Sequence, residues 1–324
     1  GGTVRRVPRP RPAELLDAAR AGDRAALARL LSMVERGGED ARAVGRAGHG
    51  LGRDAYTVGI TGAPGAGKST LTSALVGVVR RRGDRVAVLA IDPSSPFSGG
   101  AILGDRVRMG EHALDEGVFI RSMATRGHLG GLAVSAPEAV RVLTVAGFPW
   151  VLLETVGVGQ VEVEVARHAD TTMVVVNPGW GDAVQANKAG LMEVADVFVV
   201  NKADRPGADE TARDLRRMLA MAQPRSGWQP PVLCATATTG EGVEEVWQAV
   251  LDHRAHLEAT SELVERRRRR AAEEVTRLVT ARMLERARAV SAGARAAELV
   301  AAVAEGDLDP WTAADELLAE DRRP

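Results

Sequence analysis

The sequence contains very little cysteine and few aromatic side chains. Among 324 residues there is one cysteine, Cys234, and aromatic residues make up 3%. One cysteine excludes an internal disulfide bond and a metal site made of cysteines alone, and it is typical of a reducing compartment. We interpret Cys234, within the run V-L-C-A, as a small core residue. With so few aromatics, the core must be built from alanine, valine and leucine.

The chain also lacks an excess of charge and a long apolar run. It has 42 basic and 43 acidic residues, so no global basic field is available to attract nucleic acid or a membrane surface. No run approaches the ~18 apolar residues of a membrane span, and no apolar stretch of a secretion signal begins the sequence. We therefore expect a cytoplasmic protein that binds neither nucleic acid nor membrane.

The six histidines do not form a convincing metal site. His253 and His256 have helical spacing, but no cysteine or carboxylate cluster accompanies them. Zinc sites in proteins need such a set of ligands. We predict that both are surface residues.

The strongest motif is a glycine-rich loop that joins a β-branched run to a segment with helical spacing. Gly62-x-x-x-x-Gly67-Lys68-Ser69 fits the phosphate-loop pattern in the strand–loop–helix context that supports it. Such a loop surrounds phosphates with backbone N–H groups at a helix N-terminus, while the lysine reaches phosphate oxygens and the hydroxyl binds Mg²⁺. The residues expected to contact phosphate are Gly62, Ala63, Pro64, Gly65, Ala66, Gly67, Lys68, Ser69 and Thr70.

A second apolar run, R-V-A-V-L-A-I-D, ends at Asp92. It is typical of a strand that is buried on both faces of a parallel sheet. The loop that follows contains two prolines, three glycines and Asp105. Because open α/β sheets bind ligands at the carboxyl ends of their strands, Asp92 and Asp105 are candidate Mg²⁺ ligands, directly or through water. The alternative is that each aspartate only caps a turn.

A third run, W-V-L-L-E-T-V-G-V-G-Q, carries an acid at the end of an apolar strand, Glu154, and then Gly157. The glycine gives the backbone freedom to approach a γ-phosphate. This arrangement predicts a metal-side acid followed by a nucleotide-sensing loop that hydrolysis releases. We take Lys68, Glu154 and Gly157 as candidate catalytic residues; the alternative for Glu154 is a simple helix cap.

The nucleotide base is predicted by Asn201-Lys202-Ala203-Asp204, which follows the strand A-D-V-F-V-V. A carboxylate at Asp204 can accept hydrogen bonds from guanine N1–H and the 2-amino group, whereas adenine offers no such pair of donors. Asn201 would brace the loop and Lys202 would pack along the base. Thr236-Ala237 follows the next strand, and the N–H of Ala237 could reach the guanine O6.

These patterns predict an α/β fold, a mostly parallel sheet flanked by helices. We assign residues 1–53 to an N-terminal helical extension, 54–254 to the phosphate-loop domain and 255–324 to a C-terminal helical arm. In the extension we expect two helices separated near Gly22, with Asp23 as the N-cap of the second, and a linker over 37–53.

Within the other two regions we expect a helix that begins near Pro137 and, in the arm, a helix break before Asp309 as N-cap and Pro310 as first helical residue. Val275, Leu278, Val279 and Met283 form an apolar stripe. We interpret the five-arginine run Arg266–Arg270 as a solvated helix face, with a phosphate or partner contact as the alternative.

Taken together, the motifs D-P-S-S-P-F-S-G-G-A-I-L-G-D-R, R-G-H-L-G-G-L, E-T-V-G-V-G-Q, N-K-A-D and G-E-G resemble one family. It is the MeaB/MMAA/ArgK branch of the SIMIBI-class phosphate-loop GTPases, whose members chaperone adenosylcobalamin-dependent acyl-CoA mutases such as methylmalonyl-CoA mutase. The resemblance extends from about residue 13 to the end. The family's guanine-contacting S-A step is Thr236-Ala237 here, which should preserve the backbone contact.

That resemblance implies a GTPase that binds GTP or GDP with Mg²⁺, is slow alone and is stimulated by its partner. It further implies a homodimer joined through the C-terminal arm, and a loop around 179–188 that signals nucleotide state to the mutase. The assignments that it adds are phosphate and Mg²⁺ at Lys68, Ser69, Asp92, Asp105 and Glu154, and guanine at Asn201, Lys202 and Asp204.

Two other functions compete with a mutase chaperone. One is a nucleotide hydrolase or kinase associated with lysine, arginine and ornithine transport, which the guanine motif and the lack of a membrane segment disfavour. The other is a nickel-insertion GTPase, which the lack of a Cys/His-rich tract disfavours.

Overall fold

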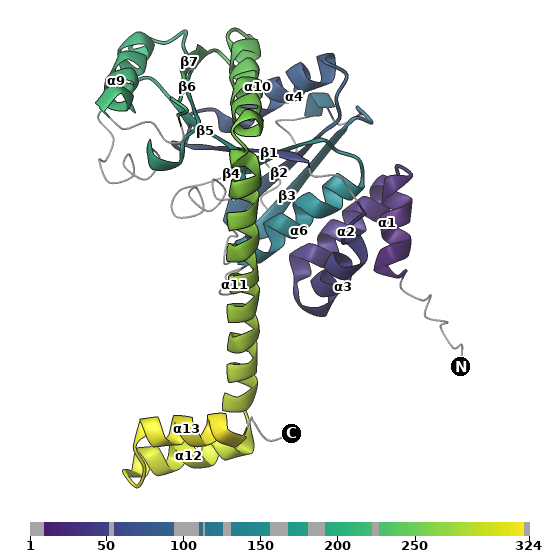
Figure 1. The fold of residues 1–324 in the computed structure, drawn as a ribbon, viewed down its shortest axis with the longest axis vertical. Coiled ribbons are helices and arrows are strands. Elements are labelled where there is room, and N and C mark those ends of the chain that lie inside the picture. The colour runs from purple at the N-terminus through teal and green to yellow at the C-terminus, as the bar shows by residue number, and fades with distance from the viewer. Residues whose placement is uncertain are drawn as a thin grey trace. The chain divides into compact units, whose positions relative to one another are not determined.

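A computed structural model describes residues 10–51, 55–93, 110–112, 114–125, 131–155, 168–180, 192–221 and 227–320 (Figure 1). Two predicted site residues, Asp105 and Gly157, lie outside these ranges, as do residues 181–188 of the predicted signalling loop. For Asp92 the structure describes the backbone only.

The helices and strands follow the phosphate-loop pattern of the sequence. The strands are β1 (Tyr56–Gly62), β2 (Val86–Pro93), β3 (Val118–Thr125), β4 (Trp150–Thr155), β5 (Thr171–Val176), β6 (Val197–Asn201) and β7 (Val232–Ala235). The helices are α1 (Pro12–Arg20), α2 (Arg24–Arg36), α3 (Gly38–Gly48), α4 (Lys68–Arg81), η1 (Gly110–His112), α6 (Gly131–Val145), α9 (Ala208–Met221), α10 (Val243–Ala259), α11 (Glu262–Ser291), α12 (Ala294–Glu305) and α13 (Pro310–Glu320).

The strands form one seven-stranded sheet in the order β3-β2-β4-β1-β5-β6-β7. Every neighbouring pair is parallel. Strands β1, β4, β5 and β6 are buried along their whole length, which explains their continuous apolar sequences. The predicted α/β class with a parallel sheet is confirmed.

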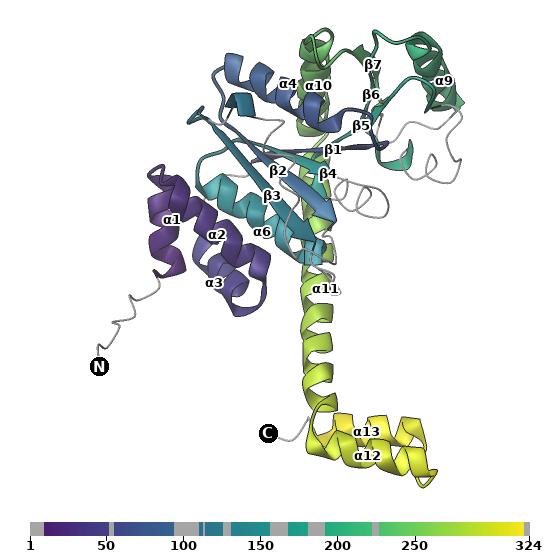
Figure 2. The ribbon, with the colours of Figure 1, turned by 180° about the vertical axis from the view of Figure 1, so that it is seen from behind.

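Helices cover both faces of this sheet (Figure 1). On one face, α4 and α10 pack on side chains from β1, β2, β4, β5 and β6. On the other face, α6 and the N-terminal helices pack on β2, β3 and β4, while α9 packs on β5 and β6. Figure 2 shows the same two layers from behind. All the carboxyl ends of the strands therefore meet at one edge of the sheet, and their starts at the other.

Over its described residues, 10–51, the N-terminal extension forms three helices, not two helices and a linker. Asp23 caps α2 as predicted, since its carboxylate accepts hydrogen bonds from the N–H groups of Ala25 and Ala26. The predicted linker is wrong because residues 38–48 form α3. Its Val44 is fully buried in the same cluster as the leucines of α1 and α2, so tertiary packing stabilises a segment of weak periodicity.

The helix expected to begin near Pro137 begins at Gly131 instead, and Pro137 lies inside α6. The buried residues Ala136, Ala139, Val142 and Leu143 pack α6 against the sheet. That packing holds the helix together across the hydrogen bond that proline cannot make.

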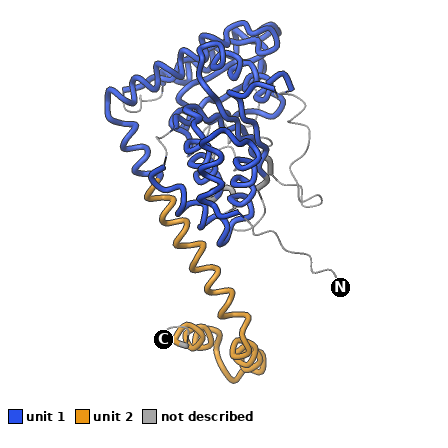
Figure 3. Tube along the Cα trace, turned by 90° about the vertical axis from the view of Figure 1, so that its right-hand side faces the viewer, with its two compact units in different colours: residues 1–270 blue, residues 271–324 orange. Residues whose placement is uncertain are grey.

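The chain divides into two compact units, residues 1–270 and 271–324 (Figure 3). In the second unit, Asp309 accepts hydrogen bonds from the N–H groups of Trp311 and Thr312, and Pro310 is the first residue of α13, as predicted. Residues 255–270, which we assigned to the arm, belong to the first unit.

Two interpretations of polar residues are wrong. Arg266, Arg267 and Arg270 are not a solvated face, because they are ion-paired with Asp196 and Asp170. His253 is not a surface residue: it is fully buried and its Nδ1 lies 2.8 Å from Thr171 Oγ1. Both errors arise at the strand-start edge, where the start of α11 meets the sheet.

Candidate functional site

The glycine-rich loop between β1 and α4 lies at the carboxyl edge of the sheet and is held against β5. Gly62 has φ 133° and Gly67 has φ 87°, values that strongly favour glycine. A Cβ atom on Gly62 would lie 1.9 Å from the carbonyl oxygen of Val175, and one on Gly67 would lie 2.5 Å from Asn201 Nδ2. The two glycines are therefore required both by conformation and by space.

The first turn of α4 places a lysine and a hydroxyl beside this loop. Lys68 and Ser69 are buried although both are polar, with relative exposures of 7% and 9%. Lys68 Nζ donates to the carbonyl oxygens of Gly62, at 2.7 Å, and Ala63, at 3.2 Å. The helix start has no side-chain cap on its N-cap residue. A helix N-terminus and an adjacent ammonium group together favour an anion.

Ser69 and Glu154 come together because β1 and β4 are neighbours in the sheet, with Ile60 opposite Glu154. Ser69 Oγ donates a hydrogen bond to Glu154 Oε1, and Glu154 is 1% exposed. A hydroxyl and a carboxylate are oxygen donors of the kind that Mg²⁺ prefers. The donor pair therefore fits the cation that the sequence predicts.

The strand that carries Asp92, β2, ends next to the strand that carries Glu154, β4. Its backbone is at the end of β2, opposite Ala124 of β3. On the other side of β2, Ala90 is opposite Glu154. The carboxyl ends of β2 and β4 are thus side by side.

The end of β6 is tied directly to the glycine-rich loop. Asn201 Nδ2 donates to the carbonyl oxygen of Ala66 at 2.7 Å, and Asn201 Oδ1 accepts from the N–H of Ala237 at 3.2 Å. Lys202 has φ 59° and its Nζ donates to the carbonyl oxygen of Gly65 at 2.6 Å. Asp204 is exposed. The structure therefore joins the glycine-rich loop, the end of β6 and the turn at Ala237 by hydrogen bonds. From the sequence, these segments were expected only to serve the same nucleotide.

The amide of Ala237, which we predicted to face a base oxygen, donates to Asn201 in this structure. It sits in a tight turn, where the N–H of Thr236 donates to Glu241 and the carbonyl oxygen of Thr236 accepts from Thr239 and Gly240. Thr236 and Ala237 are both buried. This turn places the Ala237 backbone next to the end of β6.

Sequence reasoning missed the contribution of Val175. Its carbonyl oxygen accepts a hydrogen bond from the N–H of Ala63 at 3.2 Å, so β5 supports the loop from below. A backbone contact of this kind depends on strand order and leaves no signal in side-chain identity.

Trp180, just beyond β5, is buried in the cluster of β6 and α9.

The described residues contain no helix that is long and apolar enough to cross a membrane. Over the same ranges, no three His, Cys, Asp or Glu side chains gather as a metal site. The groups that the structure does place at the carboxyl edge are amides of the glycine-rich loop, two lysines and an oxygen donor pair, which together suit a polyphosphate with a bound cation.

Comparisons with known proteins agree with this geometry. The family model described as "Methylmalonyl Co-A mutase-associated GTPase MeaB" matches residues 27–292. A protein of Pyrococcus abyssi that is named as a GTPase is 47% identical over 310 residues, covering 95% of this chain and 96% of that protein. GTPase ArgK of Escherichia coli is 42% identical over 222 residues, covering 67% of this chain and 66% of its own.

Two further relatives carry different names. The "methylmalonic aciduria type A homolog, mitochondrial" of Mus musculus is 36% identical over 216 residues, covering 65% of this chain and 52% of that protein. Among solved structures, the one described as "Crystal structure of LAO/AO transport system kinase" has a TM-score of 0.70 and 28% identity, and the match covers 96% of this chain and 98% of that one.

Proposed function

Because the chain belongs to the family of methylmalonyl-CoA mutase-associated GTPases, we propose that this GTPase is a chaperone for an adenosylcobalamin-dependent acyl-CoA mutase. It would gate the loading of the cofactor and protect or reactivate the mutase. We take methylmalonyl-CoA mutase as this partner because the family description names it. The observation that carries the proposal is the family match over residues 27–292, which includes both the nucleotide-binding edge and the whole of α11.

At the phosphate side, we propose that Lys68 binds phosphate oxygens and that Ser69 and Glu154 bind Mg²⁺, joined by Asp92 and Asp105. Lys68 would turn from the carbonyl oxygens of the loop to the nucleotide. When bound, Mg²⁺ supplies positive charge that neutralises the β- and γ-phosphate oxygens. Gly157 would bring a backbone N–H to the γ-phosphate.

At the base side, we propose that Asp204 accepts both guanine donors while Lys202 packs along the ring. Asn201 is the brace, because it already connects the carbonyl oxygen of Ala66 with the N–H of Ala237. The N–H of Ala237, which donates to Asn201 in this structure, would be shared between Asn201 and the guanine O6. Hydrolysis then depends on positioning and charge stabilisation, with no covalent step by the protein.

The chaperone proposal predicts that the mutase changes the rate of GTP hydrolysis. We expect slow hydrolysis by the chain alone and an increase of at least about tenfold on adding methylmalonyl-CoA mutase, because a partner can complete a nucleotide site. The measurement is phosphate release from GTP, with ATP in parallel and with the mutase as apoenzyme and holoenzyme. Heat-denatured mutase is the control, and hydrolysis that responds to no cobalamin-dependent mutase would contradict the proposal.

We also propose that two copies associate through α11. Val275, Leu278, Val279 and Met283 have relative exposures of 60%, 41%, 51% and 56%, and their spacing places them along one side of the helix. A contiguous exposed apolar stripe of this kind is typical of an interaction surface. A second copy is the occupant that the family resemblance implies.

Val279→Glu is expected to weaken this dimer by at least about thirtyfold, since a charge at the centre of an apolar interface costs about 2 kcal/mol or more. The measurement is size-exclusion chromatography with light scattering over a range of concentrations. Thr280→Glu is the matched control: it adds the same charge one residue away, at an exposed position off the stripe. A wild-type chain that is monomeric at every concentration would contradict dimerisation.

A second candidate function is phosphate transfer to a basic amino acid, which the name of the similar solved structure favours. The same assay distinguishes it, with lysine, arginine and ornithine added in place of the mutase. Radioactive phosphate from GTP that appears in the amino acid would support transfer. If all of the radioactive phosphate is released as inorganic phosphate, the chain only hydrolyses GTP and the transfer function is contradicted.

A further inference from the structure

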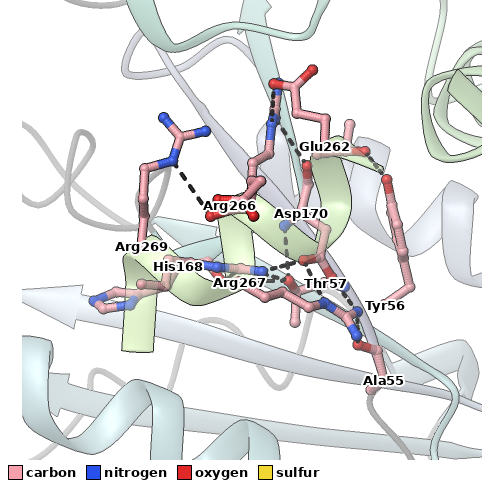
Figure 4. A network of polar contacts seen from close by, with 12 residues as sticks. Ala55, Tyr56, Thr57, His168, Asp170, Glu262, Arg266, Arg267 and Arg269 are labelled. Atoms are coloured by element: carbon pink, nitrogen blue, oxygen red, sulfur yellow. Dashed lines mark hydrogen bonds and ion pairs between the residues drawn. The ribbon is translucent and has the colours of Figure 1, made fainter. Parts of the chain in front are cut away.

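The start of α11 is attached to the sheet by a group of ion pairs that we call the arginine clamp. It consists of Arg266, Arg267 and Arg270 with Asp170 and Asp196. Arg266 Nη1 lies 3.1 Å from Asp196 Oδ2, Arg267 Nη2 lies 3.0 Å from Asp170 Oδ2, and Arg270 pairs with Asp170 Oδ1. Figure 4 shows Arg266 and Arg267 converging on the loop that carries Asp170.

The two aspartates are integral to the sheet. Each directly precedes a strand, Asp170 before β5 and Asp196 before β6. Asp170 Oδ2 accepts the N–H of Thr57 in β1 at 2.9 Å, and Asp196 Oδ2 accepts the N–H of Thr172 in β5 at 2.8 Å. Their residues are 1% and 7% exposed. The clamp therefore holds α11 to the starts of β1, β5 and β6.

The charges in the clamp balance. Glu262, at the first position of α11, pairs with Arg266 at 3.0 Å, so three carboxylates face three guanidinium groups. Burial alone would raise the pKa of Asp170, but the charges of Arg270 and Arg267 outweigh it and the pKa lies below its ordinary value. Burial lowers the pKa of the neighbouring His253 to about 4, so this imidazole is neutral near pH 7. Buried charges are tolerated when paired in this way.

The same strands contact the glycine-rich loop at their other ends. In β5, the carbonyl oxygen of Val175 accepts the N–H of Ala63. In β6, Asn201 donates to the carbonyl oxygen of Ala66. Strands β5 and β6 are only six and five residues long and are hydrogen-bonded to each other. Each therefore connects the nucleotide-binding loop with the clamp through one short element.

From this arrangement we propose that nucleotide binding at the glycine-rich loop and the hold of the arginine clamp on α11 are energetically coupled through β5 and β6. A nucleotide that displaces Lys68 and repositions the loop acts on Val175 and Asn201, and through them on the strand starts that carry Asp170 and Asp196. Since α11 is continuous from Glu262 to Ser291, the clamped turns are the first turns of the helix that enters the second unit.

The arginine run provides its own control for this proposal. Arg266, Arg267 and Arg270 share one side of the helix, and their side chains are 23%, 27% and 20% exposed. Arg268 is 77% exposed and pairs with Glu265 of its own helix. Arg268→Gln thus removes a charge from the same turn without touching the clamp.

The test is hydrogen–deuterium exchange of the backbone amides of residues 262–270 in the full chain. It is measured without nucleotide, with GDP and with a non-hydrolysable GTP analogue. In the wild type and in Arg268→Gln, we expect the exchange rate to differ between the GDP and analogue states by about fivefold or more, the scale of moderate coupling. In Asp170→Asn, exchange should be fast in both states and the difference should disappear.

Coupling also has to be reciprocal. Asp170→Asn should therefore change the ratio of the GDP and analogue dissociation constants. The factor should equal the one by which exchanging GDP for the analogue changes the opening equilibrium of the clamp. If the clamp is only structural, Asp170→Asn raises the exchange rate equally in every nucleotide state and leaves the ratio of dissociation constants unchanged. That result would overturn the proposal. So would a wild type whose residues 262–270 exchange at the same rate with GDP and with the analogue. If near-ultraviolet circular dichroism shows that Asp170→Asn does not fold, Arg270→Gln applies the same test, because it removes the partner of Asp170 on α11 and its side chain is less buried than that of Asp170.

Discussion

Lys68→Ala is expected to lower GTP hydrolysis by about a thousandfold, the scale at which removal of one group that stabilises a transition state is felt. The ammonium group is held at the first turn of α4, within reach of the loop that would surround the phosphates. The other lysine that contacts this loop in the described part of the chain is Lys202, and its Nζ reaches the carbonyl oxygen of Gly65 from the exposed side. It therefore does not duplicate the position of Lys68. The measurement is single-turnover phosphate release at saturating GTP.

The control is Arg81→Ala, which removes a cation from the last turn of the same helix, where the side chain is 69% exposed. It should hydrolyse GTP at the wild-type rate. Alanine has a high helix propensity, so Lys68→Ala should fold normally. A Lys68→Ala variant that hydrolyses GTP within tenfold of the wild type would remove this lysine from the phosphate site.

Asp204→Asn should reverse the choice of base. The carboxylate can accept two hydrogen bonds from guanine, whereas asparagine offers one acceptor and one donor. That pair matches xanthine, which has N1–H and an oxygen at position 2. We expect GTP affinity to fall by about 10⁴-fold and xanthosine triphosphate to become the preferred nucleotide. The bound base would cover Asp204, which is exposed in this structure, and a site whose covered polar groups are left unpaired discriminates on this scale.

The measurement is equilibrium binding of labelled GTP and xanthosine triphosphate. Asp209→Asn is the matched control, since it removes an acidic side chain in the first turn of α9, close in sequence to Asp204. It should bind GTP normally. Retention of GTP binding by Asp204→Asn, with no gain for xanthosine triphosphate, would place the guanine contact elsewhere.

The parts of the site that could be predicted from sequence are those fixed by local chemistry. Gly62 and Gly67 have to be glycines because of their backbone angles and the atoms beside them. Ser69 and Glu154 could be brought together by reasoning that parallel strands end at one edge, and the structure places them in contact. By contrast, the support from Val175 depends on β5 being the neighbour of β1, and strand order was not predicted.

The arginine clamp could not be predicted for a related reason. Arg267 and Asp170 are 97 residues apart in sequence, and Arg266 and Asp196 are 70 apart. A run of five arginines is the same pattern whether it faces water or buried aspartates. Likewise, α3 was missed because its stability comes from Val44 in the shared core and not from its own sequence.

The N-terminal helices have a consequence for any shortened form of the chain. Strand β3 is at the edge of the sheet, and α2 covers it: Arg24 donates to the carbonyl oxygen of Val118, and Arg121 of β3 pairs with Glu35. The leucines of α1 and α2 share a core with Phe119 and Met123 of that strand. A fragment that begins at Ala55 would expose this apolar face beside an unprotected strand edge, a combination that leads to aggregation through strand pairing between molecules.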